Sequence, residues 1–501
     1  MNVAHSAPHP AGRLQFVTST NRASLSRMHK SGRAIRLAPG LYAIDATLPP
    51  EKVAYHHRFA VAAHTWPGAV ICDRSALSGG EPVEGWLFLC HPEPPRTADL
   101  SLPGLTLSVR VGPGALPGDM PMPEGLSLSG PARGLIENAV TRGRPREGKP
   151  ARYAGLRMVE DRMDEEARVG GAGRVSRLLA QLDVISGHFG TRHVEDVRSR
   201  LAALLGTTAN APLTSSRLAA RLAGEPYDEH RLHLLERLVG YLQTVPPVPR
   251  PAVGGEGRWE WLAFFESYFS NFIEGTQFGV EEARRIAIDG EVPVARPQDA
   301  HDVAATYRIA SDPVLSQTAP VSGDHLLELL VERHSTLMAT RDDKRPGQFK
   351  LLPNYAGGYA FVAPEMVRGT LLRGFDAIAA VTDPFQRAVA VMLLLTEVHP
   401  FDDGNGRIAR LFANAELATA GQVRIVIPTV YRNNYLAGLV GVSNGAGDGQ
   451  TLVSVLDFAQ RWTALIDWSS YEAADADLRS ANAYLDSGVA ESSGIRLRLP
   501  G

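Results

Sequence analysis

Hydrophobic positions change their period along the chain. From 153 to 244 and from 258 to 470, apolar side chains recur every three or four residues, as in VSRLLAQLDVI and EHRLHLLERLVGYL, which predicts helices. The run from Phe385 to Val398 is apolar nearly all round and predicts a helix buried on most sides. Residues 60–130 instead carry short β-forming runs such as AVIC and GWLFLC. We expect a mainly α chain that begins with an α+β region.

Two segments interrupt the helical pattern. The sequence PGQFKLLPNYAGGYAFVAP (346–364) has a Gly-Gly turn between two extended runs, which predicts a β-hairpin. VPPVPRPAVGGEG (245–257) holds four prolines and three glycines, which predicts a semi-stiff spacer. The expected organisation is an α+β region (1–150), a helical region (151–244), this linker (245–257), a second helical domain (258–470) and a C-terminal tail (471–501).

Composition excludes several classes of protein. The 501 residues have a net charge of −3, which argues against a chain-wide polyanion binder but leaves a local basic patch open. The only cysteines, Cys72 and Cys90, form no CxxC pair, so we expect no disulfide scaffold or structural zinc. Apolar runs fall far short of the roughly 20 residues that a spanning helix needs. No secretion signal is evident at the start. We therefore expect a cytoplasmic protein without a membrane partner.

The clearest candidate for chemistry follows the buried helix, in HPFDDGNGRIAR (399–410). Pro400 would end the first helix, and Gly404 and Gly406 would allow the backbone to turn sharply. A second helix would begin near Asn405. Its unpaired amides and positive dipole end predict an anion site.

The side chains of this segment add three functions. Arg407 and Arg410 are three residues apart and lie on the same side of a helix. The carboxylate of Asp403 could hold Mg²⁺, and His399 can take a proton near pH 7. Each feature alone has an ordinary structural interpretation, such as a capping histidine or a solvated arginine pair. Their joint occurrence predicts a site that binds a nucleotide and transfers part of it.

HPFDDGNGRIAR resembles the Fic family signature, H-x-F-x-[D/E]-G-N-G-R-x-x-R, without a mismatch. The predicted hairpin is similar to the flap of that family, although Lys350 stands where an arginine is frequent. ERHSTLM and YRNNYLAGL also resemble family segments, so the similarity covers roughly residues 258–470. It implies a helical Fic domain with a β-hairpin flap.

The resemblance also implies an activity, the transfer of AMP from ATP to a Ser, Thr or Tyr hydroxyl of a target protein, which could be the chain itself. A glycine at 406, where the Doc-type kinase branch has a lysine, favours nucleotidyl over phosphoryl transfer. The implied roles are general base for His399, Mg²⁺ ligand for Asp403, phosphate nest for Gly404, Asn405 and Gly406, phosphate contacts for Arg407 and Arg410, adenine contact for Tyr435, and target binding on the flap for Asn354 and Tyr355.

An inhibitory element is predicted upstream. SNFIEG (270–275) resembles the family's motif [S/T]-x-x-x-E-[G/N]. Ser270 and Glu274 are one helical turn apart, Gly275 can end the helix, and a carboxylate paired with Arg410 would displace the γ-phosphate. The simpler alternative is an exposed glutamate on an aromatic-rich helix. In some relatives this glutamate positions a water for AMP removal, so a mainly deAMPylating enzyme stays an alternative.

The first half suggests a second hypothesis. Five basic residues lie between Arg22 and Arg36, in a predicted short helix before Gly32 and a hairpin through Pro39-Gly40. RAIRLAPGLYAI and later segments over much of 15–240 are similar to AbiEi-type antitoxin regulators, which have a winged helix. The first two helices of a winged helix are short or missing before Ser24. The alternative function is thus a DNA-binding autoregulator with the Fic half as its effector, or else residues 22–36 are a solvated surface. The sequence leaves the oligomeric state open.

Overall fold

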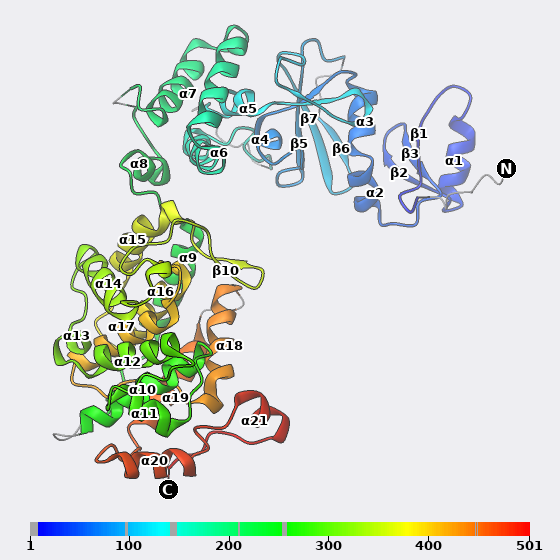
Figure 1. Cartoon of the computed structure of the whole chain (residues 1–501). Coiled ribbons are helices and arrows are strands. Elements are labelled where there is room, and N and C mark those ends of the chain that lie inside the picture. The colour runs from blue at the N-terminus through cyan, green and yellow to red at the C-terminus, as the bar shows by residue number, and fades with distance from the viewer. Residues whose placement is uncertain are drawn as a thin grey trace. The chain divides into compact units, whose positions relative to one another are not determined.

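The chain divides into two compact units, Met1–Leu222 and Ala223–Gly501 (Figure 1). The computed structural model describes residues 9–95, 99–140, 148–208, 211–252, 258–445, 447 and 449–500. Helices dominate, and the strands are concentrated in the first unit, which confirms the expected fold class. No described helix is both long enough and apolar enough to cross a membrane.

The first unit begins with a small antiparallel sheet of order β1-β3-β2. Its strands are β1 (Arg13–Phe16), β2 (Ala34–Ala38) and β3 (Leu41–Ile44), and helix α1 (Arg22–Lys30) connects β1 to β2. The predicted short helix and hairpin are both present. Gly40 adopts φ +78° in the hairpin turn, a left-handed conformation that glycine tolerates.

A six-stranded mixed sheet of order β6-β7-β5-β4-β9-β8 follows, packed with α2 and α3 around Trp66. Helices α5 to α8 form a further apolar cluster beyond it. The bounds are α2 (Pro50–His56), α3 (Arg58–Thr65), β4 (Val70–Ile71), α4 (Asp73–Leu77), β5 (Trp86–His91), β6 (Leu100–Leu102), β7 (Leu105–Val111), β8 (Met120–Pro121), β9 (Ser127–Leu128), α5 (Pro131–Asn138), α6 (Leu156–Ile185), α7 (Thr191–Leu204) and α8 (Ser216–Leu222).

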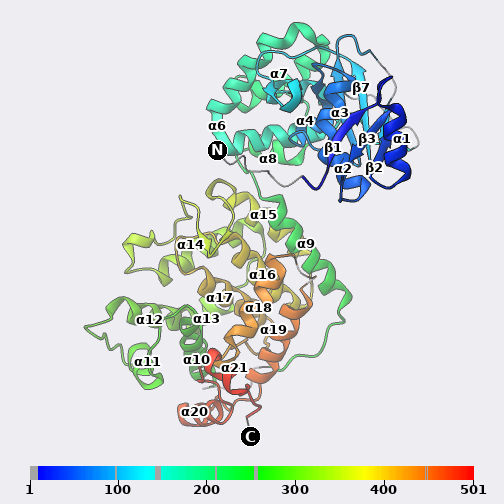
Figure 2. The same cartoon turned by 90° about the vertical axis from the view of Figure 1, so that its right-hand side faces the viewer.

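Helices α16 and α17 pack against each other near the middle of the second unit (Figures 1 and 2). The expected all-apolar helix is α16, and nearly every one of its side chains is buried. The bounds are α9 (Glu229–Thr244), α10 (Arg258–Ile273), α11 (Val280–Ala287), α12 (Pro297–Ser311), α13 (Pro313–Gln317), α14 (Gly323–Leu337), β10 (Tyr355–Ala356), β11 (Tyr359–Ala360), α15 (Val367–Ala379), α16 (Pro384–Val398), α17 (Asn405–Thr419), α18 (Arg432–Ser443), α19 (Gln450–Thr463), α20 (Tyr471–Ser480) and α21 (Ser487–Ser493).

The division between units lies upstream of the Pro/Gly segment expected as the linker. Helix α9 belongs to the second unit because Leu235, Leu238 and Leu242 bury their side chains in its core, against α15 and α16. The first part of the Pro/Gly segment is also attached there, since the Val423 N–H donates to the Pro251 carbonyl at 2.9 Å. Residues 253–257 lie outside the described part of the chain.

The residues expected as a C-terminal tail pack on the same unit. The ring of Tyr471 stacks on Phe265 of α10, with centroids 5.8 Å apart. Indole Nε1 of Trp462 donates to the carbonyl of Arg498 at 2.9 Å. Helix α20 therefore packs against α10, and α21 contacts α18.

Candidate active site

The loop between α16 and α17 turns at His399. This residue ends α16 with φ 51° and ψ 60°, a left-handed conformation. The loop is then held by Asn405, whose side chain accepts a hydrogen bond from the Phe401 N–H and donates one to the Phe401 carbonyl, both at 2.8 Å. The side-chain oxygen and nitrogen of the buried Asn405 thus both have a hydrogen-bond partner. The role of Asn405 in this structure is to fix the shape of the loop.

Only a glycine fits at position 404. Its φ is +76°, and a Cβ atom there would lie 2.4 Å from Cε of Met338. Helix α17 begins at the next residue, so its first amides face the loop. Anion binding at this helix start stays a prediction.

His399 has the electrostatics of a neutral base. Its ring stacks on Phe361, with centroids 3.8 Å apart and planes within 8°. Burial lowers the pKa of His399 to about 4, and the charge of Lys350 acts in the same direction. Nδ1 lies 3.3 Å from the Thr396 carbonyl, which can only accept, so Nδ1 carries the hydrogen. Nε2 then keeps a lone pair.

Asp403 presents a carboxylate at the edge of the loop, with 37% of its side chain exposed. Oδ1 accepts from the Gly404 N–H at 2.6 Å, and Oδ2 is 3.5 Å from a guanidinium nitrogen of Arg341. Mg²⁺ is usually held by one or two carboxylates together with substrate phosphates, so the partly exposed carboxylate of Asp403 is a group that could hold it.

His334 of α14 supports this loop and was not assigned a role from the sequence. Its ring stacks on Phe401 at 3.7 Å. Nε2 donates to the Asp403 carbonyl at 3.1 Å, while Nδ1 accepts from the Gly347 N–H at 2.9 Å. Burial lowers the pKa of His334 to about 4, which keeps the ring neutral for both bonds.

Arg410 contacts the end of α10. Its Nη2 donates to the Glu274 carboxylate at 2.7 Å, and its Nε donates to the Ser270 hydroxyl at 2.9 Å. Burial raises the pKa of Glu274, but the charge of Arg410 and this hydrogen bond outweigh it, and the pKa is lowered overall. A Cβ atom on Gly406 would lie 2.2 Å from Oε1 of Glu274. The Glu274 carboxylate therefore lies directly beside Gly406.

Arg407 is buried and paired with a residue that sequence reasoning missed. Its Nη1 lies 2.8 Å from Oδ2 of Asp302 on α12 and donates to the side-chain oxygen of Asn271 at 3.4 Å. No local sequence signal singles out Asp302, because the same helix also carries Asp299 and His301. Arg407 and Arg410 both donate to residues of α10, Asn271 and Ser270, so they lie on one side of α17, as their spacing predicted.

Tyr435 of α18 lies beside Arg410. Its side chain is 1% exposed. Burial raises the pKa of Tyr435, and Arg410 acts in the opposite direction through its charge and a hydrogen bond. Its contact with adenine stays a prediction.

The hairpin is present as β10 and β11, with Gly357 at φ +58° in the turn. Asn354 points inward, because its side-chain nitrogen donates to the Phe401 carbonyl at 3.0 Å and its oxygen accepts from Lys350 at 2.6 Å. Tyr355 is 63% exposed. Asn354 thus joins the flap to the loop, and binding of a target strand stays a prediction.

Residues 324–417 match the Fic/DOC family. The match begins at the second residue of α14 and includes the flap and the complete HPFDDGNGRIAR segment. The second unit contains a Fic domain. The resemblance stated from the sequence is confirmed for this part of the chain, whereas the likeness of 15–240 to AbiEi-type regulators stays a prediction.

Curated relatives carry the same domain. Protein adenylyltransferase fic-1 of Caenorhabditis elegans is 29% identical over 185 residues, which are 35% of this chain and 36% of the relative. Protein adenylyltransferase Fic of Drosophila melanogaster is 27% identical over 250 residues, or 46% and 47% of the two chains. The chain thus spans between about a third and a half of the length of these relatives.

Solved structures also resemble the chain. Fic-1 from C. elegans has a TM-score of 0.35 and 18% identity, covering 61% of this chain and 85% of that one. A Fic-domain signalling protein from Bacteroides thetaiotaomicron has a TM-score of 0.35 and 22% identity, covering 49% and 97%.

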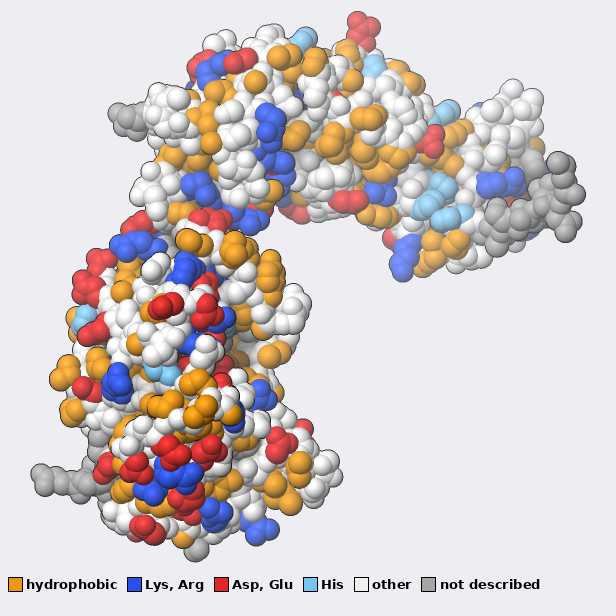
Figure 3. Space-filling view, in the orientation of Figure 1, with side chains coloured by type: hydrophobic (Ala, Val, Ile, Leu, Met, Phe, Trp, Pro, Cys, Tyr) orange, Lys and Arg blue, Asp and Glu red, His pale blue; other side chains and the backbone are white. Residues whose placement is uncertain are grey.

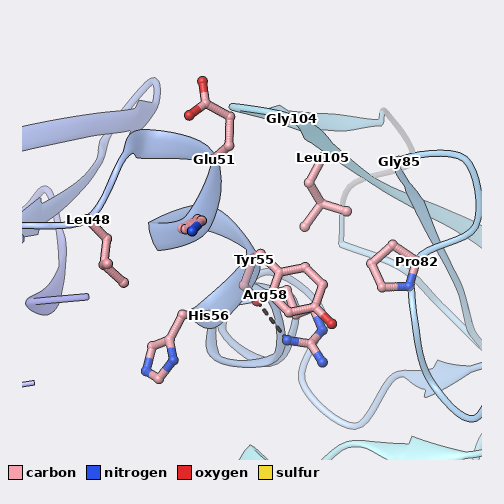
Figure 4. A pocket seen from close by; sticks show the side chains of 10 residues that line it. Leu48, Glu51, Tyr55, His56, Arg58, Pro82, Gly85, Gly104 and Leu105 are labelled. Atoms are coloured by element: carbon pink, nitrogen blue, oxygen red, sulfur yellow. Dashed lines mark hydrogen bonds between the residues drawn. The ribbon is translucent and has the colours of Figure 1, made fainter. Parts of the chain in front are cut away.

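A separate pocket of about 620 Å³ lies in the first unit, near the start of α2 and the turn before β7 (Figure 4). Tyr55 and Arg58 line it, and Arg58 donates to the Tyr55 carbonyl at 2.8 Å. Arg58 donates a second hydrogen bond to the carboxylate of Glu81 at 3.0 Å. None of the residues predicted to carry the chemistry lines this pocket.

Proposed function

We propose that this Fic domain is a protein adenylyltransferase that transfers AMP from ATP to a hydroxyl side chain of a protein. The observation that carries the proposal is that one loop joins the imidazole of His399, at the end of α16, to the start of α17. There Arg407 lies 3.6 Å from the Asp403 carboxylate and Arg410 lies 2.7 Å from the Glu274 carboxylate. The relatives named above as adenylyltransferases support the reaction class.

In the proposed reaction, Nε2 of His399 takes the proton of the target hydroxyl. The hydroxyl oxygen attacks the α-phosphorus of ATP, a new oxygen–phosphorus bond forms, and the bond to the β-phosphate oxygen breaks to release pyrophosphate. The depressed pKa supports this role because it keeps the imidazole neutral near pH 7. The amides at the start of α17 and Arg410 would stabilise phosphate charge.

Mg²⁺ fits the side chains present. Asp403 would hold the ion, which when bound would neutralise charge on the phosphates. Arg341 and Arg407 lie 3.5 and 3.6 Å from its two oxygens and would keep the carboxylate oriented. The remaining ligands would come from the nucleotide and water.

The proposal includes autoinhibition. The Glu274 carboxylate accepts a hydrogen bond from Arg410 and fills the space beside Gly406. The terminal phosphates of ATP would need this space. A bound γ-phosphate and this carboxylate would compete for one guanidinium.

Removal of AMP is the alternative activity. If Glu274 instead positions water for AMP removal, adding the unmodified wild-type protein would remove AMP from adenylylated Glu274→Gly protein.

Intact-mass spectrometry tests the reaction class. The wild type, Glu274→Gly and the double variant Glu274→Gly/His399→Ala are incubated with Mg²⁺ and each of the four nucleoside triphosphates. We expect Glu274→Gly to gain one AMP from ATP on its own hydroxyl groups, and the double variant to gain none. A gain of a phosphate alone, or of equal mass in the double variant, would contradict the proposal.

DNA binding by the first unit is a second candidate function. The exposed side chains of Arg22, Arg27 and Lys30 all lie on α1, next to the β2–β3 hairpin. On the face in Figure 3 the second unit instead intersperses acidic and basic side chains. If α1 contacts phosphates, a gel shift with the protein's own promoter should weaken steeply with salt and with Arg27→Ala/Lys30→Ala. Absence of a shift at low salt would refute this candidate and leave the enzyme proposal unaffected.

A further inference from the structure

We propose that Arg231 of α9 is a positioning residue that holds the flap against the end of α16, next to the base His399. Helix α9 precedes the residues that match the Fic/DOC family, so the family comparison does not assign it a role. The catalytic consequence rests on the proposed adenylyl transfer, whereas the structural role does not.

Arg231 contacts the flap in three ways. Its guanidinium lies over the ring of Tyr359, 4.3 Å from the centroid. One of its terminal nitrogens donates to the Tyr359 hydroxyl and the other donates to the Ala360 carbonyl. Both residues form β11, so a single side chain holds the whole strand.

The same guanidinium is tied to α16. Nη1 of Arg231 donates to Oε2 of Glu397 at 3.0 Å, and the Tyr359 hydroxyl donates to the same oxygen at 2.5 Å. The other carboxylate oxygen accepts from Ser443 of α18. The Arg231 and Glu397 side chains are 9% and 4% exposed, so each charge depends on the other for compensation. Glu397 stands two residues before His399 on the chain.

The flap needs such an anchor. Each of its strands has two residues, paired Tyr355 with Ala360 and Ala356 with Tyr359. An isolated two-stranded hairpin is marginally stable in water. Phe361 follows β11 directly and stacks on His399, so the position of the strand also sets the position of the ring against the base.

The other arm of the flap is held close to the same charge. Lys350 donates to Asn354, the residue before β10, at 2.6 Å. Burial lowers the pKa of Lys350 to about 8, and the charge of Arg231 contributes in the same direction. Lys350 also donates to the carbonyl of Val398, the last residue of α16, at 3.2 Å, so both arms of the hairpin are tied to the end of this helix.

Hydrogen exchange tests the anchor without relying on activity. The variants are Arg231→Met and Tyr359→Phe, made in the full chain, with Arg237→Met on the same helix as the matched control, since Arg237 contacts the loop after α18. We expect the amides of residues 354–361 to exchange at least fivefold faster in Arg231→Met and several-fold faster in Tyr359→Phe. The amides of α16 and α17 in these variants, and all amides of the control, should exchange as in the wild type. Unchanged exchange of residues 354–361 in both variants would overturn the inference.

Tyr359→Phe keeps the ring under the guanidinium and removes only the hydroxyl, so it remains informative if Arg231→Met fails to fold. In the Glu274→Gly background we expect Arg231→Met to slow AMP incorporation about tenfold with the Kd for ATP unchanged. Faster flap exchange with an undiminished transfer rate would refute the positioning role. If Glu274→Gly itself transfers no AMP, the proposed function fails, while faster flap exchange would still support the anchor.

Discussion

The carboxylate of Glu274 lies 2.7 Å from Nη2 of Arg410 and leaves no room for a side chain at Gly406. These residues come from the end of α10 and the first turns of α17, far apart in the sequence. The contact is a charge-assisted hydrogen bond at a place where the helix start and two arginines attract an anion. The proposed competition between this carboxylate and an incoming phosphate can therefore be tested by changing either residue.

Glu274→Gly should strengthen ATP binding and raise AMP incorporation. A hydrogen bond between charged groups is worth about 1.5–3 kcal/mol, so removing the competitor should lower the Kd for ATP by about ten- to a hundredfold. Isothermal titration with Mg²⁺ and ATP measures the affinity, and radiolabelled ATP measures incorporation. Glu291→Gly, a surface glutamate in a loop, serves as control and should behave as wild type. Equal labelling of Glu274→Gly and the wild type would refute autoinhibition.

His399→Ala, in the Glu274→Gly background, should abolish transfer but not nucleotide binding. A positioned general base contributes about 10²–10⁴-fold to rate. The phosphate contacts proposed here lie on α17 and are retained. The expected result is therefore a loss of turnover with the Kd for ATP within about twofold of the parent. A large loss of ATP affinity together with unfolding in a thermal melt would instead assign His399 a structural role.

The transfer rate should have an acid limit well below the ordinary pKa of histidine. The pKa of His399 is lowered to about 4, so the neutral form is fully present above about pH 5 and is lost as the pH falls through about 4. A base acts only when it is neutral. The rate of Glu274→Gly, corrected for stability at each pH, should thus be flat down to about pH 5. Phe361→Ala should move the limit upward by exposing the ring, and a parent limit near 6.5 would contradict the lowered pKa.

Gly406→Ala should weaken ATP binding when Glu274 is already absent. A Cβ atom at this position occupies the space that the Glu274 carboxylate fills, which is the space assigned to the terminal phosphates. In the Glu274→Gly background we expect at least a tenfold increase in the Kd for ATP. Gly441→Ala on α18, where a Cβ atom meets nothing within 4 Å, is the control and should leave the affinity unchanged. Unchanged binding by Gly406→Ala would show that phosphates lie elsewhere.

Asn405→Ala should destabilise the protein and inactivate it. The change leaves the N–H and carbonyl of Phe401 without the side-chain partners that they have in the loop. Leaving buried polar groups unpaired costs about 1–3 kcal/mol each. A chemical denaturation curve should show a free energy of unfolding that is lower by a few kcal/mol. Asn433→Ala, an exposed contact to Glu491, is the matched control and should change it by less than about 0.5 kcal/mol.

Local features were predictable because neighbours in the sequence determine them. The apolar run before His399 predicted the buried helix α16, and Gly-Gly predicted the flap turn. The spacing of Arg407 and Arg410 predicted that both lie on one side of their helix. The candidate base, metal ligand and phosphate contacts could also be predicted, because HPFDDGNGRIAR contains all of these residues within twelve positions.

Only the tertiary structure decided which distant partners these groups meet. The pattern of α9 predicted a helix but gave no reason to place it in the second unit, which depends on packing against α15 and α16. Arg407 could have paired with any of the 54 acidic residues, and the approach of α12 selects Asp302. Arg231 likewise meets Tyr359 and Glu397 through contacts between segments more than a hundred residues apart. Helical period is a property of the local backbone, whereas the pairing of buried charges is set by which surfaces the whole fold brings together.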